Sequence, residues 1–381
     1  MSFEALIKAE AVRLGFSIVG ITNSSIPPHI NEYKTWISQG YHADMDYLAT
    51  PKAILRRTDP NHIHPDVKSI ISLGYRYSPP AAPLLATSQF SGIIASYAQG
   101  PDYHRNLKTK LIELCKFLEN HTGKSYKHLW YSDTGAILEK EYAMRAGLGW
   151  IGKNSCLITR NFGSYIYLSE IFTNLDLKPD DNPGKDSCGK CNKCIEACPT
   201  GCISHNRTID SRRCISYLTI ENKGMIPLEL RPAIGNNIFG CDICQLVCPW
   251  NREEKIKNNN AFQPPNNYVN PDLRLEILLS QEGFSEKYDN STLRRIHRDG
   301  YLRNVAIALG NIKEKEIFSL LVNCFVNESD PFIKGHIAWA IGQNPHPDAI
   351  NLLVKKLGEE TNLLVLAEIQ TAIIPKTYNQ T

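Results

Sequence analysis

Cysteine spacing is the feature that most constrains this chain of 381 residues. Nine of its twelve cysteines fall between Cys188 and Cys248. The first run, 188–199, has the spacing C-x2-C-x2-C-x3-C-P, which is typical of bacterial proteins that carry two [4Fe-4S] clusters. The second run, 241–249, fits the same pattern without its first cysteine. Cys214 lies between the two runs and could take the vacant place.

Eight of these thiols divide into two sets of four, because the fourth cysteine of such a run ligates the other cluster. The first set is Cys188, Cys191, Cys194 and Cys248, and the second is Cys198, Cys214, Cys241 and Cys244. The cysteines left over, which we expect to be structural, are Cys115, Cys156, Cys202 and Cys324. A pair of zinc sites is the alternative, since C-x2-C also binds zinc. The two C-P terminations favour iron–sulfur clusters, and the absence of C-x3-C-x2-C disfavours a radical-SAM enzyme.

Composition places the chain among ordinary globular proteins, with 42% hydrophobic and 21% charged residues. No apolar run is long enough to span a membrane. The segment 1–15 has the pattern of an amphipathic helix and not of a signal peptide. We therefore expect a cytoplasmic protein, in which twelve cysteines would not form six disulfides. The net charge of +3 is too small to identify a polyanionic partner.

The part before the cysteine runs mixes predicted strands and helices. Short apolar strands are expected at Ser17–Ile21 and Ser69–Tyr75, and helices at Arg105–Glu119 and Ala136–Ala146. This pattern favours an α/β-type domain with its site in loops. The sequence 147–152 is formally G-x-G-x-x-G, but a predicted helix precedes it, so we expect these glycines to end that helix and not to bind a dinucleotide.

The part after the cysteine runs is helical and weakly repetitive. The segment 302–310 is echoed by 333–342, and 364–372 is a weaker third copy. The small residues at repeated positions predict closely packed, HEAT-like helical pairs. Six lysines and arginines lie between Ser291 and Lys315, against two carboxylates. Such a segment is either an ordinary solvated helix face or a face that binds phosphates.

The order of the motifs resembles the epoxyqueuosine reductase family over essentially the whole chain. The motifs are Tyr97-Ala-Gln-Gly-Pro-Asp-Tyr-His104, Ser132-Asp-Thr-Gly135, the segment from Glu139 to Asn154, the paired cysteine runs and the helical repeats. Two departures are Ala136, where proline is expected, and Gln99, where a basic residue is expected.

The resemblance implies an α+β protein with three parts. These are an N-terminal α/β-type cobalamin-binding catalytic domain (1–175), a two-[4Fe-4S] ferredoxin-like module (176–255) and an all-α HEAT-like repeat domain that contacts tRNA (256–381). It also implies that the protein reduces epoxyqueuosine to queuosine at the wobble position of the tRNA anticodon. That reaction is the last step of queuosine biosynthesis, and the clusters would feed electrons to the cobalamin. Asp133 matches the position of the acid that protonates the epoxide oxygen. From the sequence alone, this aspartate could equally be the N-cap of the helix that follows it.

Further contacts are implied by the same resemblance. The expected cobalamin contacts are Arg57, Ala95, Tyr97, Asp133, Ile158, Leu168 and Ser216, with Tyr103, His104 and Lys153 as weaker candidates. The expected tRNA phosphate contacts are Lys223, Arg231, Arg294, Arg295, Arg298 and Arg303. The other expected partner is an unidentified electron donor, and the chain is expected to be a monomer that does not associate with membranes.

Three other functions remain open at this point. A reductive dehalogenase would share the cofactors, but no twin-arginine signal is present. A ferredoxin-like electron carrier would not need about 175 residues ahead of its clusters. A tRNA-binding scaffold with structural clusters would not turn over a modified tRNA.

Overall fold

The structure is a computed structural model that describes residues 1–77, 88–123, 126–180, 185–252 and 268–377. Its chain divides into two compact units. The first comprises Met1–Ala81, Asp102–Arg212 and Asp242–Gln263, and the second comprises Ala82–Pro101, Arg213–Cys241 and Pro264–Thr381. The predicted ferredoxin-like segment is therefore shared between two units and does not form a compact unit of its own. The predicted boundary at residues 255 and 256 lies outside the described residues.

The first unit is built on a four-stranded sheet with the order β1-β2-β7-β4. The strands are β1 (Ile18–Asn23), β2 (Ser69–Arg76), β4 (His128–Tyr131) and β7 (Ile166–Thr173), and every neighbouring pair is antiparallel. The two strands expected from the sequence are confirmed as β1 and β2. The α/β-type description of this domain needs correction, because an α/β sheet is mainly parallel, and short apolar runs do not reveal strand direction.

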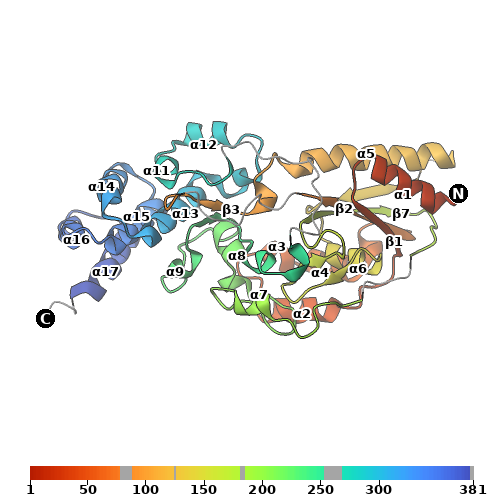
Figure 1. Ribbon diagram of the computed structural model, residues 1–381, viewed down its shortest axis with the longest axis horizontal. Helices are drawn as coiled ribbons and strands as arrows, with labels where there is room; N and C mark the ends of the chain where they lie inside the picture. Colours follow the sequence, from red (N-terminus) through yellow and green to blue (C-terminus); the bar gives the residue numbers. More distant parts are fainter. Residues whose placement is uncertain (78–87, 124–125, 181–184, 253–267, 378–381) are drawn as a thin grey trace. The chain divides into compact units, whose positions relative to one another are not determined.

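Helices cover both faces of this sheet (Figure 1). On one face lie α1 (Phe3–Arg13) and α5 (Tyr103–Thr122), and on the other lies α6 (Glu139–Arg145). The remaining helices of the unit are short: α2 (Ile30–Ser38), α3 (Asp46–Ala49), α4 (Pro51–Thr58), α7 (Lys193–Glu196) and α10 (Ile243–Leu246). All three helices predicted in this part of the chain are present, although α6 begins three residues later than expected.

The G-x-G-x-x-G sequence ends α6, as predicted. Gly147 has φ of 81°, a left-handed conformation that glycine adopts without strain. A Cβ at Gly149 would lie 2.1 Å from the carbonyl oxygen of Ile158, so only glycine allows the close approach of the two strands there. Those strands are β5 (Trp150–Ile151) and β6 (Leu157–Ile158), which form a small antiparallel pair.

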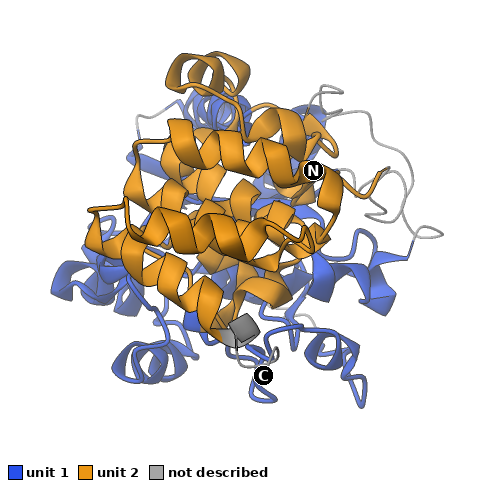
Figure 2. Cartoon of the chain, turned by 90° about the vertical axis from the view of Figure 1, so that its left-hand side faces the viewer, with its two compact units in different colours: residues 1–81, 102–212, 242–263 blue, residues 82–101, 213–241, 264–381 orange. Residues whose placement is uncertain are grey.

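The second unit is mostly helical (Figure 2). Its helices are α8 (Ile215–Ile220), α9 (Arg231–Ile234), α11 (Leu273–Glu276), α12 (Gln281–Lys287), α13 (His297–Ile312), α14 (Phe318–Asn327), α15 (Pro331–Gln343), α16 (Ala349–Leu357) and α17 (Leu363–Thr377). Two short parallel strands, β3 (Ile93–Ile94) and β8 (Asn237–Phe239), complete it. No helix among the described residues is long and apolar enough to cross a membrane.

The three repeated segments fall in α13, α15 and α17, which pack on one another in succession. The small residues act at these contacts, as the pattern predicted. A Cβ at Gly310 would lie 2.5 Å from the ring of Trp339, and one at Gly342 would lie 2.7 Å from the Cβ of Ala372. The repeated glycines thus let successive helices approach closely.

Candidate cluster centre and acid site

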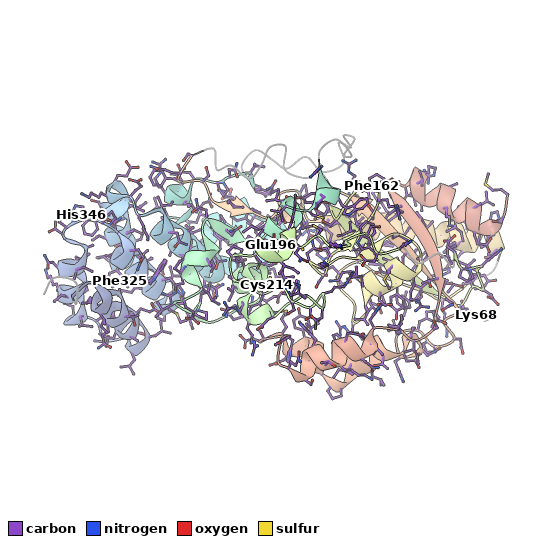
Figure 3. All side chains as sticks on the ribbon, turned by 60° about the horizontal axis from the view of Figure 1, so that its bottom comes forward. Lys68, Phe162, Glu196, Cys214, Phe325 and His346 are labelled. Atoms are coloured by element: carbon purple, nitrogen blue, oxygen red, sulfur yellow. The ribbon has the colours of Figure 1, made fainter. Side chains whose placement is uncertain are left out.

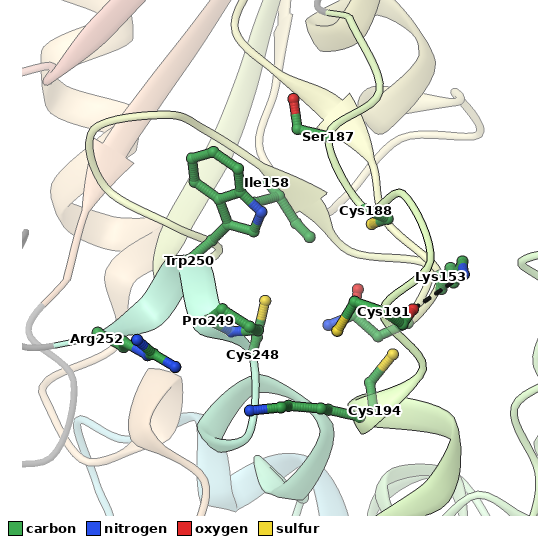
Figure 4. A pocket seen from close by; sticks show the side chains of 12 residues that line it. Lys153, Ile158, Ser187, Cys188, Cys191, Cys194, Cys248, Pro249, Trp250 and Arg252 are labelled. Carbon is green, nitrogen blue, oxygen red and sulfur yellow. Dashed lines mark hydrogen bonds between the residues drawn. The ribbon is translucent and has the colours of Figure 1, made fainter.

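Four thiols of the first predicted set line one cavity of about 370 Å³ in the first unit. Cys188, Cys191 and Cys194 come from the first cysteine run, and Cys248 comes from the end of the second. Figure 4 shows the side chains of these residues around a common space, with Ile158 and Trp250 forming apolar walls. The spacing therefore brings together the four side chains that were assigned to one cluster.

The arrangement fits a multi-iron cluster better than a single ion. Among the described residues, no three Cys, His, Asp or Glu side chains are close enough to hold one metal ion. A zinc site needs its thiolates gathered around one point, whereas a [4Fe-4S] cluster spreads four thiolates over four irons. The cavity of about 370 Å³ leaves room for such a group among the four thiols.

Two side chains of the first unit support the first cluster loop. The indole Nε1–H of Trp150 donates to the sulfur of Cys188 at 3.4 Å. Lys153 Nζ donates to the carbonyl oxygens of Gly189 and Cys191, at 3.0 and 2.9 Å, and to Asn192 Oδ1. Lys153 was a weaker candidate for cobalamin contact. Its hydrogen bonds instead stabilise the loop that carries the three cluster cysteines of the first run.

The second predicted set is divided between the units. Cys198 and Cys244 belong to the first unit, and Cys214 and Cys241 belong to the second. Cys214 stands at the N-cap position of α8 and is labelled in Figure 3. Hydrogen bonding to Cys202 and Thr200 lowers the pKa of the Cys198 thiol to about 4, against desolvation. Cys198 is therefore a thiolate near neutral pH, the form that binds iron.

Two of the cysteines expected to be structural are unreactive by environment. Burial raises the pKa of Cys115 to about 12 and that of Cys324 to about 11. Burial also raises the pKa of Cys248, an expected cluster ligand, to about 11, so a protonated thiol does not by itself distinguish structural cysteines from ligands.

Asp133 lies on the loop between β4 and α6, with φ of 55°, in the left-handed region that non-glycine residues rarely occupy. Its backbone N–H donates to Glu139 Oε1 at 2.7 Å, and the Tyr103 hydroxyl donates to its Oδ2 at 2.9 Å. The neighbouring Ser132 hydroxyl donates to the carbonyl oxygen of Leu168 at 3.0 Å. Bonds to α5, α6 and β7 thus hold the exposed carboxyl of Asp133 in place.

The interpretation of Asp133 as a helix N-cap is wrong. Helix α6 begins at Glu139, its N-cap residue is Leu138, and no side chain caps it. Asp133 lies six residues before that helix starts. Its strained backbone is instead fixed by the loop contacts, which is typical of functional positions.

Two further carboxyl groups lie beside Asp133, and sequence reasoning gave neither of them a role. Burial, and secondarily the negative charge of Asp133, raise the pKa of Glu139 to about 8. Glu170 of β7 is completely buried, and burial raises its pKa well above the ordinary value, with Glu139 and Asp133 adding to the effect. The available signal was a glutamate in the mostly apolar strand 166–173, since strands seldom bury an unpaired carboxyl group.

Comparisons with known proteins agree with these features. Residues 187–251 match the family described as "4Fe-4S double cluster binding domain", and residues 57–134 match "Epoxyqueuosine reductase QueG, DUF1730". Epoxyqueuosine reductase from Escherichia coli strain K12 is 38% identical over 339 residues, which is 88% of each protein. The chain belongs to the epoxyqueuosine reductase family.

Solved structures of the epoxyqueuosine reductase family match the chain almost end to end. One, which holds an epoxyqueuosine-modified stem loop of tyrosine tRNA, has a TM-score of 0.89 at 30% identity and covers 97% of both chains. Another, from Bacillus subtilis, has a TM-score of 0.87 at 31% identity and covers 97% of this chain and 98% of that one. It is described with its catalytic aspartate loop swung out of the active site.

The cobalamin contacts implied by the epoxyqueuosine reductase family lie in both units. Arg57, Asp133, Ile158 and Leu168 belong to the first, and Ala95, Tyr97 and Ser216 to the second. Within the first unit, Leu168 is joined to the Asp133 loop through Ser132, and Ile158 lines the cluster cavity. Arg57 is buried, with its guanidinium 5.5 Å from the centre of the Tyr33 ring.

One of these expected contacts is already engaged. The backbone N–H of Ala95 donates to the carbonyl oxygen of Phe239 at 2.8 Å, in the pairing that continues β3 and β8. Ala95 therefore cannot offer this N–H to a cofactor, and its side chain is buried as well. Tyr97 and Ser216 are half-buried, so part of each side chain stays accessible.

Two of the six basic residues that we expected to bind tRNA are buried. Arg231 forms a bidentate ion pair with Glu368, with both N–O distances at 2.7 Å. All three guanidinium nitrogens of Arg303 donate to neighbouring oxygen atoms, including the carbonyl oxygens of Leu218 and Gly224. These two expectations are corrected: both arginines hold the second unit together and do not face a ligand.

The other four basic residues differ in exposure. Lys223, Arg294 and Arg295 are exposed, and Arg294 and Arg295 form surface ion pairs with Asp289 and Glu221. Arg298 is more enclosed, because it donates to Glu328 and to the carbonyl oxygen of Leu279. Lys223, Arg294 and Arg295 are thus the candidates that a phosphate could reach.

Proposed function

We propose that this chain is an oxidoreductase that reduces epoxyqueuosine to queuosine at the wobble position of tRNA. Its membership of the epoxyqueuosine reductase family supports this activity, as does its likeness to a relative that holds an epoxyqueuosine-modified tRNA stem loop. The observation that carries the proposal is the exposed Asp133 carboxyl, held by Tyr103 and Glu139 in a chain that also forms a four-thiol cavity. An acid and an electron-transfer centre are the two requirements for reducing an epoxide.

Two [4Fe-4S] clusters are part of this proposal. The match of residues 187–251 to a double cluster domain supports both of them. The cavity among Cys188, Cys191, Cys194 and Cys248 fits the first cluster. The second would take Cys198, Cys214, Cys241 and Cys244, of which Cys198 is already a thiolate at neutral pH. Such clusters accept and release single electrons, so they suit a reaction that consumes two.

Cobalamin is the second cofactor that we propose. The chemistry that it supplies when bound is a strongly reducing cobalt centre that opens the epoxide ring. In the first unit, the Leu168 side chain is only partly buried and lies one hydrogen bond from the Asp133 loop, so an apolar face of the corrin can pack there. Tyr97 and Ser216 would contribute contacts from the second unit.

Asp133 is the proposed proton donor to the epoxide oxygen. An oxygen that leaves carbon as an alkoxide is strongly basic, and a proton delivered as the bond breaks removes that cost. The Tyr103 hydroxyl bonds to one oxygen of the carboxyl, which leaves the other available to the substrate. Glu139 fixes the backbone of the same residue, so the acid is held at a defined position.

We place part of the tRNA contact on Lys223, Arg294 and Arg295. These exposed cations would bind phosphates of the anticodon loop and position it without reading its sequence. The modified wobble base, unstacked from the loop, would then reach the acid.

Nucleoside analysis of cellular tRNA tests this function. The chain is expressed in cells that lack epoxyqueuosine reductase and therefore accumulate epoxyqueuosine. The expected result is replacement of epoxyqueuosine by queuosine with the native chain and not with the Asp133→Asn variant. Unchanged epoxyqueuosine with soluble, iron-loaded native chain would refute the proposal. It would leave the electron-carrier and scaffold functions as the remaining candidates.

A further inference from the structure

Glu170 is the most unusual buried group in the first unit. It lies on β7 directly opposite Ser72 of β2 and Tyr131 of β4, so these three side chains share one face of the sheet. Phe172, two residues further along β7, packs against Tyr142 of α6, which identifies this face as the one beneath α6. Glu170 therefore lies between the sheet and the helix whose first residue is Glu139.

Neither carboxyl oxygen of Glu170 has a hydrogen-bond partner among the described residues, although the residue is completely buried. The hydroxyls of Ser72 and Tyr142, from the strand and the helix that flank it, are likewise buried without partners. An ionised carboxylate in such a place would be prohibitively unfavourable, whereas a neutral carboxylic acid is tolerable. Several unpaired polar groups around one buried acid also provide the partners that an internal water molecule needs.

Few positive charges act against the protonation of Glu139 and Glu170. Positive groups near Glu139 are Arg57 of α4 and Lys140 of α6, and both act to lower its pKa. Arg145 lies near Tyr142, and no cation in the described part of the chain acts appreciably on Glu170. The negative neighbours of Glu170 are Glu139 and Asp133, so the three carboxyls repel one another when ionised.

The number of retained protons follows from these contacts. Glu139 keeps its proton until about pH 8, and Glu170 keeps its own proton beyond its ordinary range. At neutral pH Glu139 and Glu170 thus hold one proton each. Groups coupled in this way titrate as a set.

We propose that Glu139 and Glu170 store the two protons consumed in reducing the epoxide and deliver them through Asp133. This inference rests on the proposed function. Reduction of the epoxide breaks two C–O bonds and forms one C=C double bond and two O–H bonds of water. It consumes two electrons, which an external one-electron donor supplies through the clusters, and two protons. Asp133 takes a proton from Glu139 and donates it to the epoxide oxygen. Glu170 then resupplies Glu139, the second proton follows the same route through Asp133, and solvent refills the store afterwards.

The role of Glu139 is thus double. Its carboxyl accepts the backbone N–H of Asp133 at 2.7 Å, which positions the acid, and its proton replenishes that acid. Neither function belongs to Glu141, a buried carboxyl two residues further along α6 that pairs with His29 at 2.8 Å. Glu141→Gln is therefore the matched control.

Infrared difference spectroscopy tests the store directly and without turnover. Titration of the iron-loaded native protein from acid to alkaline pH should reveal carboxylic acid C=O bands that persist at neutral pH. One band should disappear on ionisation near pH 8 and be absent in Glu139→Gln, and a second should be absent in Glu170→Gln. If the native protein has no protonated carboxyl band at neutral pH, the proposal is overturned.

Single-turnover rates across pH test the use of the protons. In native, pre-reduced protein the rate of queuosine formation should fall with an apparent pKa near 8. We expect Glu170→Gln to slow the chemical step at least tenfold with unchanged KM, and Glu139→Gln to remove the alkaline fall. Rates and pH profiles equal to those of Glu141→Gln would overturn the proposal. Failure of the native protein to form queuosine would instead refute the proposed function, and the infrared result would still stand.

Discussion

The backbone amide of Asp133 donates a 2.7 Å hydrogen bond to Oε1 of Glu139, the first residue of α6. This bond fixes a left-handed residue on an otherwise exposed loop. It involves only the backbone of Asp133, so it survives a change of that side chain. The position of the loop and the chemistry of its carboxyl can therefore be separated by experiment.

Replacement of the acid should abolish chemistry and preserve binding. Asp133→Asn keeps the shape and the backbone contact but cannot donate a carboxylic proton, and we expect turnover to fall by about 100-fold or more. Cobalamin content and tRNA affinity should stay at native values. Asp66→Asn is the control, because Asp66 is also an exposed, left-handed aspartate. Native turnover in Asp133→Asn would exclude this residue as the acid.

The hydrogen bond from Trp150 to Cys188 should tune the first cluster. Donation to a ligating sulfur stabilises the more negative, reduced cluster, so Trp150→Phe should lower its reduction potential. A bond of about 1 kcal/mol corresponds to roughly 40 mV for one electron. The measurement is a redox titration followed by electron paramagnetic resonance, with Trp130→Phe as the control. An unchanged potential would mean that the indole has no influence on the cluster.

Loss of Cys214 should remove one cluster and leave the other. The first set of thiols does not include this residue, so Cys214→Ser should lower iron from about eight to about four per chain. Cys115→Ser should keep the native iron content, because Cys115 lies in α5, outside both cysteine runs. Iron and sulfide analysis of anaerobically prepared protein makes the comparison. Full iron content in Cys214→Ser would require a different ligand for the second cluster.

The ion pair of Arg231 and Glu368 should stabilise the helical unit. Arg231 has only 1% of its side chain exposed, so Glu368→Ala leaves a buried cation without its partner. Breaking such a pair costs about 3–5 kcal/mol. Faster hydrogen exchange in α15 and α17 should report the loss, whereas Glu359→Ala, at an exposed pair with Lys356, should have little effect. Equal exchange in the two variants would contradict the prediction.

The exposed arginines should act on tRNA through charge alone. Removing Arg294 and Arg295 together should weaken binding of the stem loop. It should also reduce the salt dependence of the affinity by about one unit of slope for each phosphate that the variant no longer neutralises. Arg274→Ala is the control, since Arg274 is an exposed arginine of the same unit that we do not assign to tRNA. The measurement is the affinity for the tRNA stem loop at several salt concentrations. If the double variant keeps the native slope, the tRNA lies elsewhere.

Local patterns predicted more of this protein than long-range ones. Cysteine spacing placed Cys188, Cys191 and Cys194 around one cavity, because two-residue loops leave a chain few alternatives. Cys248, from the second run, was assigned by the pattern of paired cluster runs. The helical repeats were found from the likeness of the segments 302–310, 333–342 and 364–372. Charge was a poorer guide, since Arg231 and Arg303 look like phosphate ligands in sequence and are buried by helices far along the chain.

The acid site was predicted in part. Resemblance to the family pointed to Asp133, but Glu170 lies 37 residues further along the chain and meets the site only through sheet register. The direction of the strands was equally beyond the sequence, because an apolar run looks the same in parallel and antiparallel sheets. These features depend on the pairing of distant segments.

Mass spectrometry of a purified reaction is the most direct test of the central claim. Protein loaded with iron, sulfide and cobalamin is reduced anaerobically and mixed with a tRNA stem loop that carries epoxyqueuosine. The predicted result is loss of one oxygen atom from the modified nucleoside, in proportion to the protein and dependent on Asp133. An unaltered nucleoside, from protein that holds about eight iron atoms and one corrinoid per chain, would contradict the account.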